Sequence, residues 1–203
     1  MKRFKSREEG YHTWSEGEVA QFESHHPDGS KARLVLALAL YTSQRISDVV
    51  RMGWQHVQGD RIAVRQEKTD TPLLIKMHPE LLRVLATVPK TNMTFVLTPH
   101  GKPFTAQGMS NWFGKRCREA GLSHCSAHGL RKLGATRLAN AGASNEQIKS
   151  QTGHKTHKEV ERYTKAASQT RLNDQALALQ LRAEAERKIA QPENRLCKSD
   201  EKS

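Results

Sequence analysis

The sequence predicts a mainly helical α+β domain with a small antiparallel β-sheet, and three observations predict it. A continuous apolar run at residues 34–41 indicates a buried helix. Two short β-type runs flank a polar turn between residues 60 and 75, as in a hairpin. From Thr105 onward the residue pattern is helical, and glycines follow the predicted helices. A chain of 203 residues is long enough for one such domain with a core, plus tails.

Two helices are expected in the first 41 residues. Residues 13–16 have the residue types of a capping box and predict the start of the first helix. Residues 25–30 contain proline and glycine and should end it. Residues 31–41 form the second helix, which is apolar almost throughout, so we expect it to be deeply buried.

A β-hairpin and another helix are expected next. Residues 60–65 and 71–75 are the predicted strands, joined by the polar turn at residues 66–70. His78, Pro79 and Glu80 predict a helix start. Three leucines of that helix should face inward: Leu81, Leu82 and Leu85. Residues 95–97 are expected to form a short strand or extended segment.

The second half of the chain should be helical. Helices are predicted at residues 106–120, 127–140 and 144–151, each followed by a glycine that can cap its C-terminus. A further helix carries Tyr163, and residues 170–190 are rich in strong helix formers. We therefore expect a basic arm or linker remnant at residues 1–12, a domain at 13–170, and a C-terminal helix with a disordered tail at 171–203.

The charge of the chain favours a polyanionic partner. Lys and Arg outnumber Asp and Glu by 33 to 21, which gives a net charge of +12. Nucleic acid is the first expectation and an anionic membrane surface the second. The longest apolar run is far shorter than the roughly 20 residues that span a bilayer, and no apolar signal core follows the N-terminus. We expect a cytoplasmic protein without a membrane partner.

The cysteines and the acidic residues do not predict a cofactor. The three cysteines are irregularly spaced and indicate reduced thiols, as in the cytoplasm. A zinc site built from Cys117, His124, Cys125 and His128 has no recognised ligand spacing. The sequence has no glycine-rich phosphate loop and no carboxylate cluster for two magnesium ions. We expect no metal and no cofactor.

Four short motifs carry the candidate chemistry. Arg45 follows the buried helix, His128 and Arg131 share a helix face one turn apart, and His154 and Tyr163 follow. Arginine can hold a phosphate with two hydrogen bonds, imidazole can move protons near neutral pH, and a phenol can act as a nucleophile. Taken singly, each has an ordinary alternative, such as an ion pair of Arg45 with Asp48 or a core position for Tyr163.

In this order the motifs resemble the catalytic domain of the tyrosine recombinase (phage integrase) family, over about residues 13–167. The first family arginine lies in a Thr-Gly-x-Arg-x-x-Glu-like motif. Here Ser43 replaces the glycine, and Asp48 takes the place of the acidic residue. The family's hairpin lysine falls on Lys68, with Lys76 as a nearby rival. Its remaining motif positions fall on His128, Arg131, His154 and Tyr163.

The resemblance implies a reaction. Arg45 and Arg131 would clamp one DNA phosphodiester, and Tyr163 would attack phosphorus to give a 3′-phosphotyrosyl intermediate. His128 is the candidate general base and Lys68 the candidate acid. His154 would donate to a non-bridging oxygen.

Double-stranded DNA is the implied partner. Five basic residues are candidate phosphate contacts, with a solvated charged surface as the alternative: Lys115, Arg116, Arg118, Lys132 and Lys155. In the family a C-terminal element often docks onto a neighbouring subunit in a tetramer. A modest apolar stripe in the tail fits such a homo-oligomer on DNA, or a helix that folds back on its own domain: Leu172, Ala176, Leu179 and Ala183.

Two questions stay open at this point. Family members usually carry a helical core-binding domain ahead of the catalytic one, so the chain is a catalytic fragment, a truncated reading frame or a minimal relative. Four basic residues near the N-terminus fit a linker remnant: Lys2, Arg3, Lys5 and Arg7. The competing functions are a type IB topoisomerase-like or telomere-resolving enzyme, a non-catalytic DNA-binding relative of the same fold, and a helix-turn-helix regulator.

Overall fold

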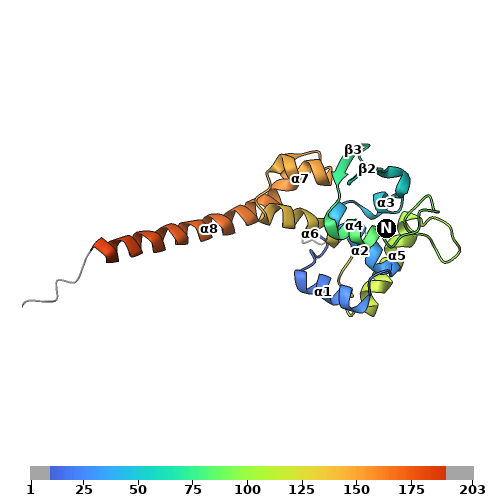
Figure 1. The fold of residues 1–203 in the computed structure, drawn as a ribbon, viewed down its shortest axis with the longest axis horizontal. Helices are drawn as coiled ribbons and strands as arrows, with labels where there is room; N and C mark the ends of the chain where they lie inside the picture. The colour runs from blue at the N-terminus through green and yellow to red at the C-terminus, as the bar shows by residue number, and fades with distance from the viewer. Residues whose placement is uncertain (1–9, 191–203) are drawn as a thin grey trace, which may run out of the picture.

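The computed structural model describes residues 10–190, without the side chains of a few residues in the last helix. Residues 1–9 of the predicted arm (1–12) and residues 191–203 of the predicted C-terminal region (171–203) lie outside this part. The elements, in chain order, are α1 (Glu16–His25), α2 (Lys31–Thr42), α3 (Ile46–Val49), a 3₁₀ turn (Trp54–His56), β1 (Val57–Gln58), β2 (Arg61–Arg65), β3 (Pro72–Lys76), α4 (Pro79–Leu85), α5 (Ala106–Glu119), α6 (Ala127–Asn140), α7 (Asn145–Thr152) and α8 (His157–Ala190). Figure 1 shows α8 leaving the packed part of the molecule as a single long rod.

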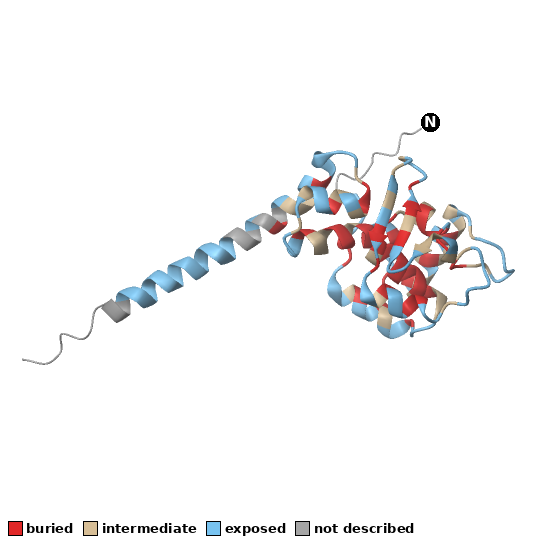
Figure 2. Cartoon of the chain, turned by 45° about the horizontal axis from the view of Figure 1, so that its top comes forward, coloured by how far each residue is buried: buried red, intermediate tan, exposed pale blue. Residues whose placement is uncertain are grey.

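Helix α2 is the centre of the core. Every residue from Leu34 to Leu40 is buried, as the apolar run predicts. Figure 2 shows that buried residues are gathered in the packed part of the molecule, away from the exposed rod of α8. The helix packs on α4 and α6. Gly134 of α6 allows a close approach, because a Cβ there would stand 2.2 Å from Ser43 Oγ. This contact brings the end of α2 directly against α6.

The sheet has three antiparallel strands in the order β1-β2-β3. The predicted hairpin is confirmed, with Ile62 opposite Ile75 and Arg65 opposite Pro72. The two-residue strand β1 was not expected from the sequence; it pairs Val57 with Ile62. Such a short strand is specified by its partner rather than by its own residue pattern.

Three expectations needed correction. The capping box of α1 is formed by Ser15 and Glu18, two residues later than predicted, since both reciprocal hydrogen bonds connect this pair. Leu82 is 39% exposed; Val84 is buried in its place, because it lies on the helix face that meets the core. Of the two alternatives expected for residues 95–97, a short strand or an extended segment, the strand is not formed, and Leu97 makes only an isolated bridge to Pro103.

The helices of the second half are confirmed, with their ends within about two residues of the predictions. Gly153 ends α7 in the left-handed conformation at φ 68°, which glycine adopts without steric cost. It turns the chain from α7 towards α8 immediately before His154. In the described part of the chain, no helix is both long and apolar enough to cross a membrane.

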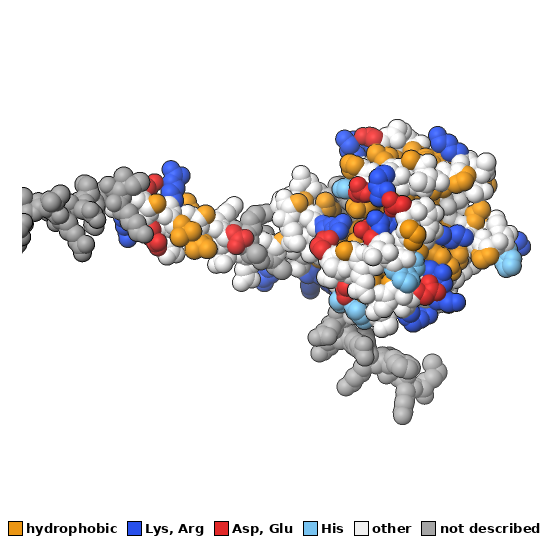
Figure 3. Space-filling model, turned by 60° about the horizontal axis from the view of Figure 1, so that its bottom comes forward, with side chains coloured by type: hydrophobic (Ala, Val, Ile, Leu, Met, Phe, Trp, Pro, Cys, Tyr) orange, Lys and Arg blue, Asp and Glu red, His pale blue; other side chains and the backbone are white. Residues whose placement is uncertain are grey.

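Helix α8 runs through the expected boundary at residue 170 without a break. Residues 173–187 are all exposed, so this part of the helix does not fold back onto its own domain (Figures 1 and 2). Leu177 and Leu181 are 53% and 55% exposed and lie off the predicted stripe, because about 100° per residue puts them roughly opposite Leu179. Hydrophobic side chains are visible along this rod in Figure 3.

Candidate active site

Arg45 is held at the break between α2 and α3. Ser43 ends α2 in the left-handed conformation at φ 54°, and Arg45 is the N-cap residue of α3. Its Nη1 atom is buried and has no hydrogen-bond partner among the described residues. No ion pair joins Arg45 to Asp48 in the part of the chain that the structure describes. The side chain therefore presents a buried donor that the protein itself leaves unused.

Arg131 of α6 is the most deeply buried cation of the site, with 2% of its surface exposed. Its Nη1 donates to the carbonyl oxygen of Ser43 at 2.7 Å, while Nη2 is buried without a partner in the described residues. Burial, and then the positive charge of Arg45, lowers the pKa of Arg131 to about 10. Two guanidiniums that feel each other's charge, each with a buried unpaired nitrogen, form a site that favours an anion.

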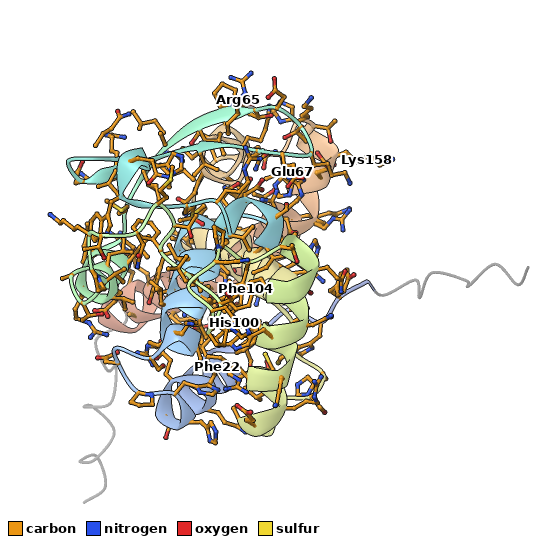
Figure 4. The ribbon with its side chains drawn as sticks, turned by 90° about the vertical axis from the view of Figure 1, so that its right-hand side faces the viewer. Phe22, Arg65, Glu67, His100, Phe104 and Lys158 are labelled. Carbon is orange, nitrogen blue, oxygen red and sulfur yellow. The ribbon has the colours of Figure 1, made fainter. Side chains whose placement is uncertain are left out.

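Asp48 ties the hairpin turn to this site. Its Oδ1 accepts a hydrogen bond from the Glu67 backbone N–H at 2.8 Å, and its negative charge favours the charged form of Arg131. Figure 4 shows Glu67 on the same side of the domain as Lys158, near the start of α8. The turn after β2 thus lies beside the segment that carries His154 and Tyr163.

A buried amide network, which sequence reasoning missed, fixes this turn. Gln66 is 1% exposed, and its Nε2 donates to Gln44 Oε1 at 2.6 Å and to the Thr152 carbonyl at 2.8 Å. Its Oε1 accepts from the Thr69 hydroxyl at 2.6 Å. The network links residues next to Arg45, Lys68 and Gly153. No sequence signal pointed to this network, because Gln66 is an ordinary polar residue that belongs to no recognised motif.

Lys68 is exposed in the hairpin turn, close enough to His128 for its charge to lower the pKa of that ring. Its rival Lys76 instead forms an ion pair with Asp60 at 3.4 Å, at the other end of the hairpin. The geometry therefore brings Lys68, and not Lys76, to the cluster of predicted residues.

His128 lies in the first turn of α6, with its ring 4.6 Å from the ring of Tyr11. The residue is exposed at the surface, yet crowding around its ring, and then the charge of Arg131, lowers its pKa. A neutral imidazole at neutral pH can accept a proton.

His154 follows the cap of α7. Its Nδ1 lies 2.7 Å from the hydroxyl oxygen of Thr152, and the proton of that hydroxyl is donated to the Ile148 carbonyl. Burial, and then the charge of Arg131, lowers the pKa of His154 to about 4. A bound phosphate would favour the protonated ring, which donates from both nitrogens.

Tyr163 lies on α8, half-buried against α6 and α7, with its ring 6.2 Å from that of His154. Burial raises the pKa of the phenol, while the charges of Arg162 and Arg131 act in the opposite direction. The residue borders a hollow of about 350 Å³ that is also lined by Thr13 and Lys132. The residues that line this hollow do not include the other five predicted catalytic residues. The charge of Arg131 nevertheless acts on the pKa of His128, His154 and Tyr163, and the charges of Arg45 and Lys68 act on the pKa of His128. These interactions place all six predicted catalytic residues around one positively charged region.

The five candidate phosphate contacts differ in their surroundings. Lys155 lies near the hairpin residue Asp70, whose pKa its charge helps to lower. Lys132 donates to the Tyr11 carbonyl at 2.6 Å. Arg116 pairs with Glu119 at 2.5 Å, while Lys115 and Arg118 are exposed on α5. On the face shown in Figure 3, acidic and basic side chains are interspersed, so the net positive charge is not concentrated there.

Comparison with known proteins gives three findings. A model of the phage integrase family matches residues 17–170. An integrase of Escherichia phage HK022 is 26% identical over 158 residues, which are 71% of this chain and 44% of the relative. Crystal structures of a lambda integrase dimer bound to a COC′ core site and of XerA recombinase superpose with TM-scores of 0.63 and 0.67, at 22% and 18% identity.

These matches differ in how much of each protein they cover. The lambda integrase match covers 80% of this chain and 61% of that one, and the XerA match covers 80% and 64%. The chain thus spans less than half the length of the curated relative and less than two thirds of these two structures. At these identities the structural likeness shows a shared fold.

Proposed function

Since this chain belongs to the phage integrase family, whose catalytic-domain fold its sequence predicts, we propose that it is a site-specific DNA recombinase. The observation that carries the proposal is the pair of buried, unpartnered guanidinium nitrogens of Arg45 and Arg131. Leaving such donors buried and unpaired costs about 1–3 kcal/mol each. A phosphodiester would supply the missing acceptors, and Tyr163 borders the same region.

The proposed reaction uses each residue once. The Tyr163 phenol oxygen attacks phosphorus, the bond between phosphorus and the 5′ oxygen breaks, and a 3′-phosphotyrosyl link forms. His128 takes the phenol proton, and Lys68 gives a proton to the leaving 5′ oxygen. Arg45, Arg131 and a protonated His154 stabilise the charge on the non-bridging oxygens. Attack by another 5′-hydroxyl reverses the step, so the reaction needs no ATP.

Double-stranded DNA is the proposed partner, bound mainly through phosphates. Each neutralised phosphate should contribute about −0.9 to the slope of log affinity against log salt. A binding isotherm at several salt concentrations measures that slope. An affinity independent of salt would contradict this mode of binding.

The assembly on DNA is proposed to be a homo-oligomer, such as a tetramer, joined through α8. A lambda integrase tetramer bound to a Holliday junction is among the similar structures. In this chain the exposed leucines of the α8 rod have no intramolecular contact that would bury them: Leu177, Leu179 and Leu181. Sedimentation with DNA, with and without residues after 173, should show a smaller complex for the shortened chain.

The test of the proposed reaction is covalent trapping. Tyr163→Phe should abolish protein–DNA adducts on a pool of nicked duplexes whose cleaved strand dissociates, because phenylalanine has no nucleophilic oxygen. The matched control is Tyr41→Phe, whose ring stacks on His78 at 4.5 Å outside the site. Adducts that persist in Tyr163→Phe would remove this residue from its role. Site-independent relaxation of a supercoiled plasmid would instead favour the topoisomerase-like alternative.

A further inference from the structure

A second polar cluster lies outside the proposed active site, where the N-terminal segment (residues 10–14) meets α1 and the turn before α6. It consists of His12, Glu18, His124 and Cys125, whose ligand atoms all lie within 4.8 Å of one another. His12 Nε2 is 2.9 Å from both carboxylate oxygens of Glu18, and His124 Nε2 is 2.5 Å from Oε1. The two imidazole rings are 4.7 Å apart. Residues separated by up to 125 − 12 = 113 positions in sequence thus converge on one point.

The donor atoms of this cluster suit a zinc ion. Two imidazole nitrogens, one carboxylate oxygen and one thiol sulfur are all established zinc ligand types, and four protein ligands are typical of a structural site. In a tetrahedral site with zinc–ligand bonds of about 2.0–2.3 Å, the ligand atoms are about 3.3–3.8 Å apart. The ligand atoms now lie between 2.5 and 4.8 Å from one another, so their separations would need to change by only about 1 Å to reach that arrangement.

Burial and orientation also fit a metal site. Cys125 is 5% exposed, while the side chains of His12 and His124 are 41% and 52% exposed, which leaves a path for an ion. The backbone N–H of Ser15 donates to Glu18 Oε2 at 2.7 Å. This bond orients the carboxylate so that Oε1 faces the two imidazoles, as outer partners of metal ligands commonly do.

We propose that His12, Glu18, His124 and Cys125 form a structural zinc site that fastens the N-terminal segment to the start of α6. The set differs from the combination considered from the sequence. Cys117 lies in the core within α5, and the ring of His128 instead lies tilted against the ring of Tyr11. His12 and Glu18 could not be found by ligand spacing, because they precede the other two ligands by more than 100 residues.

The position of the site gives it a structural consequence. Tyr11, next to His12, covers the ring of His128, and its carbonyl accepts a hydrogen bond from Lys132. Gly129 lets the segment lie directly on α6, because a Cβ there would stand 2.2 Å from the His12 carbonyl oxygen. An ion bound at the cluster would therefore hold residues 11 and 12 against the helix that carries His128 and Arg131.

The test uses the full chain without DNA, so its result does not depend on the proposed recombinase activity. Chelator-treated protein is titrated with Co²⁺ as a spectroscopic probe and then with Zn²⁺. We expect one Co²⁺ to bind per chain and a thiolate-to-cobalt charge-transfer band to appear as Cys125 loses its proton. When Zn²⁺ displaces Co²⁺, the bound cobalt and the charge-transfer band should both be lost. Zn²⁺ should also raise the melting temperature, because it binds the folded chain.

Matched variants assign the ligands. Cys125→Ser should abolish the charge-transfer band, while Cys117→Ser, a buried cysteine outside the cluster, should retain it. His124→Ala should weaken Zn²⁺ binding at least tenfold, about the loss expected even for an outer-sphere partner. His100→Ala, an exposed histidine on a loop (Figure 4), should leave binding unchanged.

Three outcomes would overturn the proposal. They are Co²⁺ bound without a thiolate band, no saturable binding of either ion, and an equal loss of affinity in His100→Ala and His124→Ala. If Cys125→Ser fails to fold, the exposed ligands His12 and His124 carry the test, since alanine at either position removes a ligand without disturbing the core.

Discussion

Two polar regions lie within seven residues of each other at the start of α6, and they are built in opposite ways. The anion pocket proposed at Arg45 and Arg131 holds positive charges that repel each other, and two of its buried nitrogens have no partner among the described residues. The cluster of His12, Glu18, His124 and Cys125 surrounds one carboxylate with groups that hydrogen-bond to it. The arginines of the first region lack hydrogen-bond acceptors that an anion would supply. The groups of the second region already hydrogen-bond to one another, and they also carry lone pairs that can bind a cation.

The difference lies in how the polar groups of each region affect the stability of the fold. Groups that must bind a ligand in a reaction are kept unpaired, at a cost in stability that the rest of the core offsets. Groups that hold segments together are paired already, so they contribute to stability before any ligand arrives. The sign of the stability change on removing a charge should therefore differ between the two regions.

The largest expected effect is that of Arg131→Met. Loss of one preorganised donor should lower the rate of adduct formation by about 10²–10³-fold. The same change should raise the free energy of unfolding by about 1 kcal/mol. The lowered pKa of Arg131 reflects a charge penalty of about 3 kcal/mol, partly offset by the lost hydrogen bond to Ser43.

Single-turnover kinetics and urea unfolding measure the two effects. Arg61→Met, at an exposed position of β2, is the control and should change neither by much. A clear loss of stability in Arg131→Met would show that the pocket is not strained, and the contrast between the two regions would fail.

Acid should weaken the pocket through His154. Burial and the charges of Arg131, Arg45 and Arg162 hold the pKa of this ring at about 4, with only Glu159 among its named neighbours acting in the opposite direction. The unfolded chain takes up the proton first, since an unperturbed histidine titrates near pH 6.5. Stability should thus be complete above about pH 6.5 and fall by at most about 3 kcal/mol as the pH drops towards 4.

Unfolding between pH 7 and 4 tests this sign. His154→Asn should show a shallower loss over that range than the original chain. Sulfate should also reduce the loss, because an anion between the arginines favours the protonated ring. An unchanged pH slope in His154→Asn would contradict the environment described for this residue.

The geometry of the pocket should also depend on the neutral amide network of Gln66. The side chains of the cluster instead contact one another directly. Gln66→Leu removes two donated bonds and one accepted bond at a buried position, and leaves Gln44 and Thr152 with unpaired oxygens. We expect a loss of about 2 kcal/mol in stability and slower adduct formation with little change in DNA affinity. Gln107→Leu, on the exposed surface of α5, should change stability by no more than about 0.5 kcal/mol. Equal stability losses in both variants would contradict the network.

The sequence predicted what is encoded locally. The hairpin, the capping glycines and the order of Arg45, His128, Arg131, His154 and Tyr163 all follow from short patterns. What it missed depends on contacts between distant segments, since Gln66 and Thr152 are 86 residues apart.

The same reason explains other misses. The strand β1 exists only through its partner β2. Leu82 was expected inside because leucine is apolar, but which face of α4 meets the core is decided by α2. The stripe expected in the tail could not reveal that α8 would extend past the domain instead of packing on it.

The smallest expected change in the free energy of unfolding comes from a substitution in the cluster. Its sign should be opposite to that expected for Arg131→Met. In chelator-treated protein, Glu18→Gln should destabilise the chain by about 1 kcal/mol. Glutamine keeps one oxygen, but its amide group can no longer accept from the Ser15 N–H and both imidazoles together. Glu80→Gln, in an exposed pair with Arg83, is the control and should change stability by less than about 0.5 kcal/mol. Urea unfolding measures the stability of both variants and of Arg131→Met. If the two regions are built as described, removing a charge from the pocket stabilises the protein and removing one from the cluster destabilises it. A stabilising Glu18→Gln would mean that the carboxylate, too, is held at a cost until a ligand binds.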